Sequence, residues 1–150
     1  MKNLNWDPNL ETGIAQIDHQ HRILFKHAAS LLQAVHAERA EDQITGMVKF
    51  LNLHVNSHFA CEELAMALSS YRDLDNHRLM HRDLSYKVGF INICFTDEGY
   101  DTTKTMVTYF IKWLTRHIDT EDRRMADHLK TWIENNPGVS LDTIFSCFDV

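Results

Sequence analysis

The fold is decided by one stretch, which runs from residue 42 to residue 68 and reads DQITGMVKFLNLHVNSHFACEELAMAL. It contains no proline, and apolar or weakly polar side chains recur along it every three or four residues, which is typical of one face of an α-helix. That inward face comprises Met47, Leu51, His54, His58, Glu62 and Ala65. The stretch therefore predicts a long helix whose buried face carries histidine and glutamate.

Three other stretches have the same periodicity. They cover residues 17–35, residues 75–95 with Asp75 as the N-cap, and the residues from about 102 to 117. We expect a loop over residues 96–101 between the last two. Four amphipathic helices with short connections predict an all-α, up-down-up-down four-helix bundle.

The two ends of the chain lie outside this pattern. Residues 1–16 have the character of an extended arm, and a shorter helical piece is expected over residues 121–134. We expect the bundle to occupy residues 1–136 and residues 137–150 to form a C-terminal extension or a linker stub. Apolar residues at helical spacing in this extension are Leu141, Ile144, Phe145 and Phe148. They could contact a signalling domain or partner, or they could fold back over the bundle.

Composition excludes several classes of function. The formal net charge of −6 argues against a nucleic-acid partner and against an anionic membrane surface. No apolar stretch is long enough to span a bilayer, and the first residues lack the apolar run of a signal peptide. The three cysteines, an odd number without Cys-x-x-Cys spacing, argue against a disulfide framework. A reducing cytoplasm is therefore the expected location.

Ionisable side chains lie on the very faces that should form the core. His58 and Glu62 are four residues apart, as are His77 and His81, so about 400° of helical rotation returns each pair to one face. The inward faces of the first and fourth helices carry His21 and His117.

Asp122 follows His117 by five residues, a spacing that a regular helix would rotate away from the core. Both side chains can point inward only if the helix bulges, kinks or ends between Ile118 and Glu121.

Five imidazoles and two carboxylates inside a bundle require a cation. Burying each carboxylate without one would cost several kcal/mol. Two divalent ions would neutralise the carboxylates and leave only a small positive charge. Mixed imidazole and carboxylate donors suit iron better than magnesium or calcium, and a closed structural zinc site would need only four ligands.

The chain resembles the hemerythrin family, including bacterial hemerythrin-like domains, from about Trp6 to Trp132. The resemblance rests on four segments, in order: Gly13-Ile14-x-x-Ile17-Asp18-x-Gln20-His21, His58-Phe59-x-x-Glu62-Glu63, His77-x-x-x-His81 and Trp113-Leu114-x-x-His117-Ile118-x-x-x-Asp122. All seven ligand positions of the family are filled.

The resemblance implies a non-heme diiron centre (Fe2+/Fe3+) with a bridging oxo or hydroxo group. One iron would take His77, His81 and His117; the other would take His21 and His58 and keep a position open for dioxygen. Glu62 and Asp122 would bridge the two irons. An apolar oxygen pocket would be lined by Leu24, Phe59, Trp113 and Leu114, which would also serve as ordinary core residues.

Several residues near these motifs have a structural interpretation. His19 should face away from the core, and His27, His36 and His128 should be solvated surface residues. Glu63 is expected to be a solvated charge and Cys61 a small packing residue, although a thiol beside such a site could be oxidised. His54 has two interpretations: a group that hydrogen-bonds within the bundle, or a replacement ligand.

Reversible dioxygen binding is the expected activity. A site of this kind is compatible with three biological functions. The first is oxygen carriage or storage. The second is oxygen or redox sensing, as the input domain of a signalling protein. The third is a diiron oxidoreductase acting on peroxide or nitric oxide. The imidazole-rich ligand set argues against an enzyme, because diiron oxygenases favour carboxylates.

Overall fold

The protein is all-helical over the residues that the structure, a computed structural model, describes: 4–149, with side chains up to Cys147. The helical segments in chain order are the 3-10 turn η1 (Pro8–Leu10), α1 (Ala15–His36), α2 (Glu41–Leu68), α3 (Leu74–His117), the π-helical turn η2 (Ile118–Asp122), α4 (Arg123–Asn135), α5 (Leu141–Ile144) and the 3-10 turn η3 (Ser146–Asp149). Within these residues none of the helices combines the length and the apolar character needed to cross a membrane.

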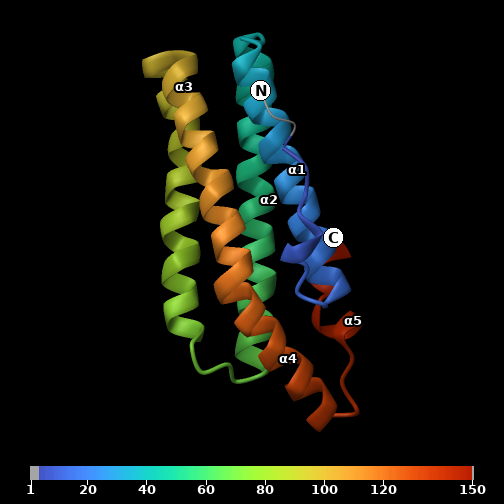
Figure 1. The fold of residues 1–150 in the computed structure, drawn as a ribbon. Coiled ribbons are helices and arrows are strands. Elements are labelled where there is room, and N and C mark those ends of the chain that lie inside the picture. Colours follow the sequence, from blue (N-terminus) through green and yellow to red (C-terminus); the bar gives the residue numbers. More distant parts are fainter. Residues whose placement is uncertain (1–3, 150) are drawn as a thin grey trace.

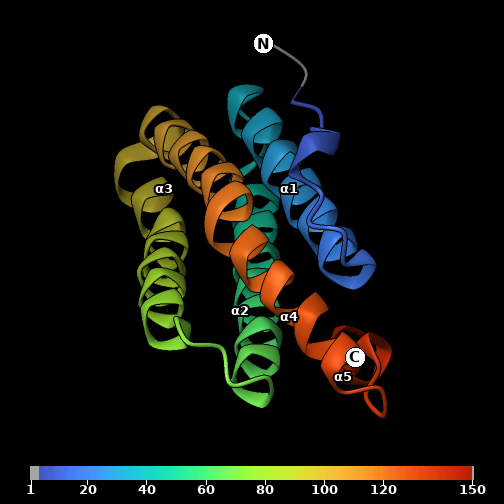
Figure 2. The same ribbon diagram turned by 60° about the horizontal axis from the view of Figure 1, so that its bottom comes forward.

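Four long helical rods lie side by side in alternating directions (Figures 1 and 2). They are α1, α2, the outgoing arm of α3, and its returning arm, which continues through η2 into α4. The two arms of α3 meet at Gly99, which leaves the helical conformation with φ 81° and ψ −162°. The predicted up-down-up-down bundle is thus confirmed.

Three local predictions are wrong. The loop expected over residues 96–101 narrows to Gly99, because one residue without a Cβ tolerates a positive φ and is enough to reverse the chain. The third helix begins at Leu74, so its N-cap is Asp73 and not Asp75. The N-terminal arm is not extended throughout, since η1 interrupts it and α1 already starts at Ala15.

The core consists of two apolar clusters. The larger includes Leu24, Leu51, Leu84 and Phe110, and the smaller includes Ile17, Met66, Leu129 and Phe145. Along each rod, the polar residues of interest fall between a member of one cluster and a member of the other. On α1, for example, His21 lies between Ile17 and Leu24. A polar layer therefore separates two apolar regions.

The C-terminal extension folds back onto the bundle. Ile144 and Phe145 are buried, and they pack in the smaller cluster against residues of α1, α2 and α4. Leu141 is partly buried and packs against the same cluster. The side chain of Phe148 lies outside the described residues. Of the two readings of this segment, the structure supports the covering one. The division at residue 136 stays a prediction.

The expectation of free thiols is wrong for one pair. Cys61 on α2 and Cys147 in η3 form a disulfide, with their Cα atoms 6.0 Å apart, while Cys94 is free. The two bonded cysteines are 86 residues apart. Their pairing could not be inferred from spacing because it depends on the return of the C-terminal segment.

Candidate metal centre

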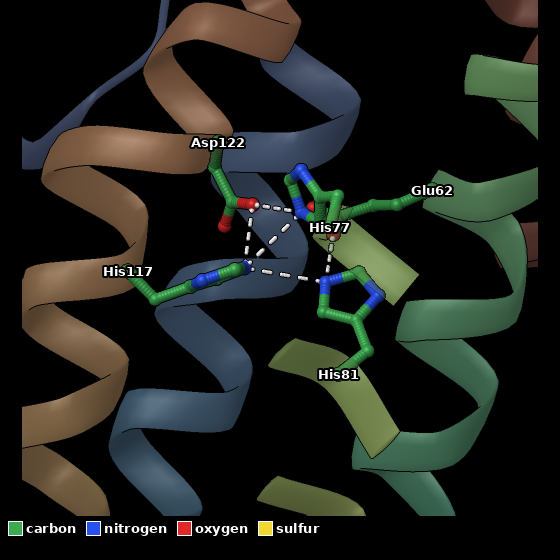
Figure 3. Close-up of side chains that lie close together, drawn as sticks. All are labelled: Glu62, His77, His81, His117 and Asp122. Carbon is green, nitrogen blue, oxygen red and sulfur yellow. Dashed lines mark hydrogen bonds and ion pairs between the residues drawn. The ribbon is translucent and has the colours of Figure 1, made fainter. Parts of the chain in front are cut away.

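All seven side chains predicted to bind metal meet in the polar layer, and each is at most 3% exposed. They form two groups in which one potential ligand atom per residue lies within 4.8 Å of the others. The first group is Glu62, His77, His81, His117 and Asp122 (Figure 3); the second is His21, His58, Glu62 and Asp122. The two carboxylates belong to both groups.

Helix geometry places most of these side chains directly. His58 and Glu62 share one face of α2, and His77 and His81 share one face of the first turns of α3, because each pair is separated by four residues. The start of α1 is fixed by the buried Asp18, whose carboxylate accepts hydrogen bonds from the backbone N–H (2.7 Å) and hydroxyl (2.8 Å) of Thr12.

Asp122 reaches the layer because of the π-helical turn η2. The wider turn lets residues five apart share a face, so Asp122 Oδ1 lies 3.0 Å from His117 Nε2. Within this turn the Thr120 hydroxyl donates to the Arg116 carbonyl at 2.8 Å, a contact that helps to satisfy the distorted backbone. The predicted irregularity between Ile118 and Glu121 is confirmed.

Both carboxylates reach histidines of both groups. Glu62 Oε1 lies 3.0 Å from His58 Nε2 and 3.3 Å from His21 Nε2, and Glu62 Oε2 lies 3.3 Å from His81 Nε2. Asp122 spans the layer in the same way, with Oδ2 3.1 Å from His21 Nε2 and Oδ1 3.1 Å from His77 Nε2. Each carboxylate is thus placed between two clusters of nitrogens.

The donors fit a cation better than they fit one another. His117 Nε2 lies 3.2 Å from both His77 Nε2 and His81 Nε2, so three ring nitrogens converge on one point (Figure 3). Both carboxylate oxygens of Glu62 are buried without a hydrogen bond of good geometry among the described residues. Converging imidazole and carboxylate lone pairs in a dry layer match the donor set of iron.

The contacts between histidines and carboxylates in the polar layer shift the pKa values of both kinds of group. Burial opposes protonation of His21, yet its contacts with Asp122 and Glu62 raise the pKa of this imidazole to about 9. Burial likewise works against ionisation of Glu62, but His58 and His21 hold the pKa of this carboxyl well below its usual range. In the metal-free protein a proton on His21 offsets part of the negative charge of the two carboxylates, and a bound cation would displace it.

Apolar side chains adjoin the polar layer on the side of the larger cluster. Three of the predicted pocket residues are buried in that cluster: Leu24, Phe59 and Leu114. Trp113 is partly buried and packs against it. The Trp113 ring stacks on His117 with centroids 4.4 Å apart, and the Phe59 ring stacks on His81 at 3.8 Å. These contacts brace two of the histidines; the role of the four residues as an oxygen pocket stays a prediction.

The other histidines lie outside both groups. His19 and His36 are exposed, as predicted. His54 is half-buried and its ring contacts those of Phe50 and His27, at 4.3 Å and 5.4 Å between centroids, so the structure offers no support for a replacement ligand.

Three further interpretations are wrong. His27 is not a solvated surface residue, because it is half-buried and its ring lies against those of Phe50 and His54. His128 is not a solvated surface residue, because it is half-buried and its Nε2 lies 3.1 Å from the Ser69 carbonyl.

Glu63 is not a solvated charge: its Oε1 accepts a hydrogen bond from His81 Nδ1 at 3.0 Å. Phe59, four residues earlier on α2, also contacts His81, but both contacts depend on how α2 packs against α3 and gave no signal in the sequence.

Comparison with known proteins agrees with this geometry. Residues 12–129 match the family described as Hemerythrin HHE cation binding domain. The chain belongs to the hemerythrin family. Hemerythrin domains hold a diiron centre and bind oxygen there, and this hemerythrin has a histidine, glutamate and aspartate cluster suited to it.

Named relatives cover most of this hemerythrin. It is 32% identical over 126 residues to a bacteriohemerythrin of Clostridium acetobutylicum, a match that covers 81% of this chain and 98% of the relative. A bacteriohemerythrin of Stenotrophomonas maltophilia is 29% identical, with 85% and 82% coverage. A myohemerythrin of Theromyzon tessulatum is 25% identical, with 78% and 86% coverage.

Proposed function

We propose that this hemerythrin carries or stores dioxygen, which it binds reversibly at a diiron centre. The observation that carries the proposal is the sharing of Glu62 and Asp122 between the two histidine groups, since a carboxylate that reaches two sets of donors is placed to bridge two cations. One metal position would take His77, His81 and His117, and the other His21 and His58. The second position has fewer protein donors, which leaves room for an external ligand.

The residues around the centre would control what reaches it. Iron bound by these residues would supply the electrons for reversible binding of dioxygen. Leu24, Phe59 and Leu114 offer no proton donor and are at most 3% exposed. A dry, apolar boundary of this kind would keep water and stray protons away from the two metal positions.

Carriage is favoured over sensing by the C-terminal segment. A docking strip for a signalling domain would need exposed apolar side chains, whereas Ile144 is 5% exposed and Phe145 is 1% exposed. We also propose a cytoplasmic location, where cellular reductants would keep Cys61 and Cys147 as thiols.

Metal analysis with an optical spectrum tests the proposal. We expect two irons per chain, and a visible absorption band that appears with oxygen and vanishes on its removal over repeated cycles. Replacing His21 with Ala should abolish the band, whereas the same change at the exposed His36 should leave it intact. A single zinc ion per chain, or a band that does not return, would contradict the proposal.

The lifetime of the oxygenated form separates the candidate uses. A carrier should remain oxygenated for minutes to hours before it oxidises, because its pocket withholds protons. Leu114→Ala should shorten that lifetime by opening a cavity beside the centre, with little loss of iron. A wild-type lifetime within a minute would instead favour a sensor or an oxidoreductase.

A further inference from the structure

Two carboxylates outside the seven-residue cluster contact the outward nitrogens of its histidines. Glu63 Oε1 lies 3.0 Å from His81 Nδ1, and Glu121 Oε2 lies 3.6 Å from His117 Nδ1. The other nitrogen of each ring, Nε2, points into the cluster (Figure 3). Each imidazole is therefore held between a carboxylate on its outer side and the candidate metal position on its inner side.

Glu63 is firmly placed for this contact. Its second oxygen lies 3.5 Å from Arg78 Nε, and its side chain is only 26% exposed. The Phe59 ring lies parallel to the His81 ring at 3.8 Å, with an interplanar angle of 6°. An ionised carboxylate can only accept hydrogen bonds, so His81 Nδ1 must donate and its Nε2 lone pair must face the cluster.

Glu121 has a looser version of the same arrangement. The hydroxyl of the neighbouring Thr120 lies close to the Glu121 oxygen that faces His117, so its one hydrogen is shared between this oxygen and the Arg116 carbonyl. The distance of 3.6 Å to His117 Nδ1 is an ion-pair contact and is too long for a good hydrogen bond. Its influence on the ring should be the weaker of the two.

The carboxylates of Glu63 and Glu121 contact histidines of the same metal-binding group. His81 and His117 both belong to the group that contains three histidines. In the second group, His21 Nδ1 is buried without a hydrogen-bond partner among the described residues. The outer nitrogens of His81 and His117 thus face a carboxylate, whereas that of His21 does not.

We propose that Glu63 is a positioning residue for His81, which fixes the tautomer and orientation of this ring and raises its basicity as a ligand of the three-histidine position. Glu121 acts in the same direction on His117. A carboxylate behind a metal-binding imidazole raises its basicity and tightens its hold on the metal. This inference rests on the proposed function, because it assumes that the cluster holds iron.

Glu63→Gln tests the proposal, because it keeps the size of the side chain and removes its charge. We expect iron affinity, measured by competition with a chelator, to fall by about 10–100-fold, as is typical when such a partner is lost. We also expect the reduction potential of the iron pair to become more positive, since a nearby negative charge has gone. A purely structural role for Glu63 would not move the potential.

Asp83→Asn is the matched control. It removes the same charge from α3, where the Asp83 carboxylate lies 2.8 Å from Lys87 Nζ and contacts no residue of the cluster. This variant should keep the wild-type affinity and potential. Glu121→Gln should shift both in the same direction as Glu63→Gln but less, which keeps the proposal testable if Glu63→Gln does not fold.

The outcomes separate this inference from the proposed function. If the wild-type protein does not hold two irons, the proposed function fails first. If it does, and both glutamine variants match Asp83→Asn in iron affinity and reduction potential, the positioning role is overturned.

Discussion

Glu62→Ala is expected to leave the protein without either metal ion and with much lower stability. The Glu62 carboxylate lies within 3.3 Å of histidine nitrogens in both groups, so its removal takes one donor from each metal position. It also leaves the buried imidazoles with Asp122 as their one remaining counter-charge inside the layer. Loss of one partner from a buried ionic cluster costs about 3–5 kcal/mol in the free energy of unfolding.

Iron content and thermal unfolding measure this effect. We expect iron to fall from two per chain to near zero, and the midpoint of unfolding to fall by on the order of 10 °C for a chain of this size. Glu134→Ala, at an exposed position of α4, should change neither quantity. A Glu62→Ala protein with two irons and an unchanged midpoint would rule out the bridging role.

Removal of residues 139–150 is the second change with a large expected effect. It strips Ile144 and Phe145 from the smaller apolar cluster, where each contributes about 1.5–3 kcal/mol by burial. It also removes the disulfide, which closes a long loop between α2 and η3 and contributes up to about 5 kcal/mol. Denaturant unfolding should show a large fall in the free energy of unfolding.

Cys147→Ser separates the two contributions. This variant should lose only the contribution of the disulfide, and a reducing agent should bring the wild-type protein to the same stability. Cys94→Ser, which changes a free cysteine, should behave as the wild type. If truncation leaves stability and iron content unchanged, the C-terminal segment is no part of the folded core.

The sequence predicted the bundle and the meeting of seven polar residues because helical periodicity is local. Pairs such as His77 and His81 are placed by rotation along one helix, without knowledge of its neighbours. The spacing of His117 and Asp122 also predicted the irregular turn, because a regular α-helix does not place residues five apart on one face.

What the sequence missed depends on contacts between elements. Glu63 was assigned to solvent from its rotation on α2, but its side chain reaches across to His81 on α3. The bond between Cys61 and Cys147 depends on how the last residues return to the bundle. His128 likewise gains its burial from Ser69, which lies at the end of a different helix. Periodicity within one helix carries no information about such contacts.

The division of the core into two apolar regions bears on how cooperatively the molecule unfolds. Every rod crosses from one region to the other through ionisable side chains, which hold one another weakly without metal. Iron would join the two ends of the bundle into a single unfolding unit. In the metal-free protein the two apolar regions would be coupled less strongly, and amide exchange in the smaller region would be faster than in the iron-bound protein.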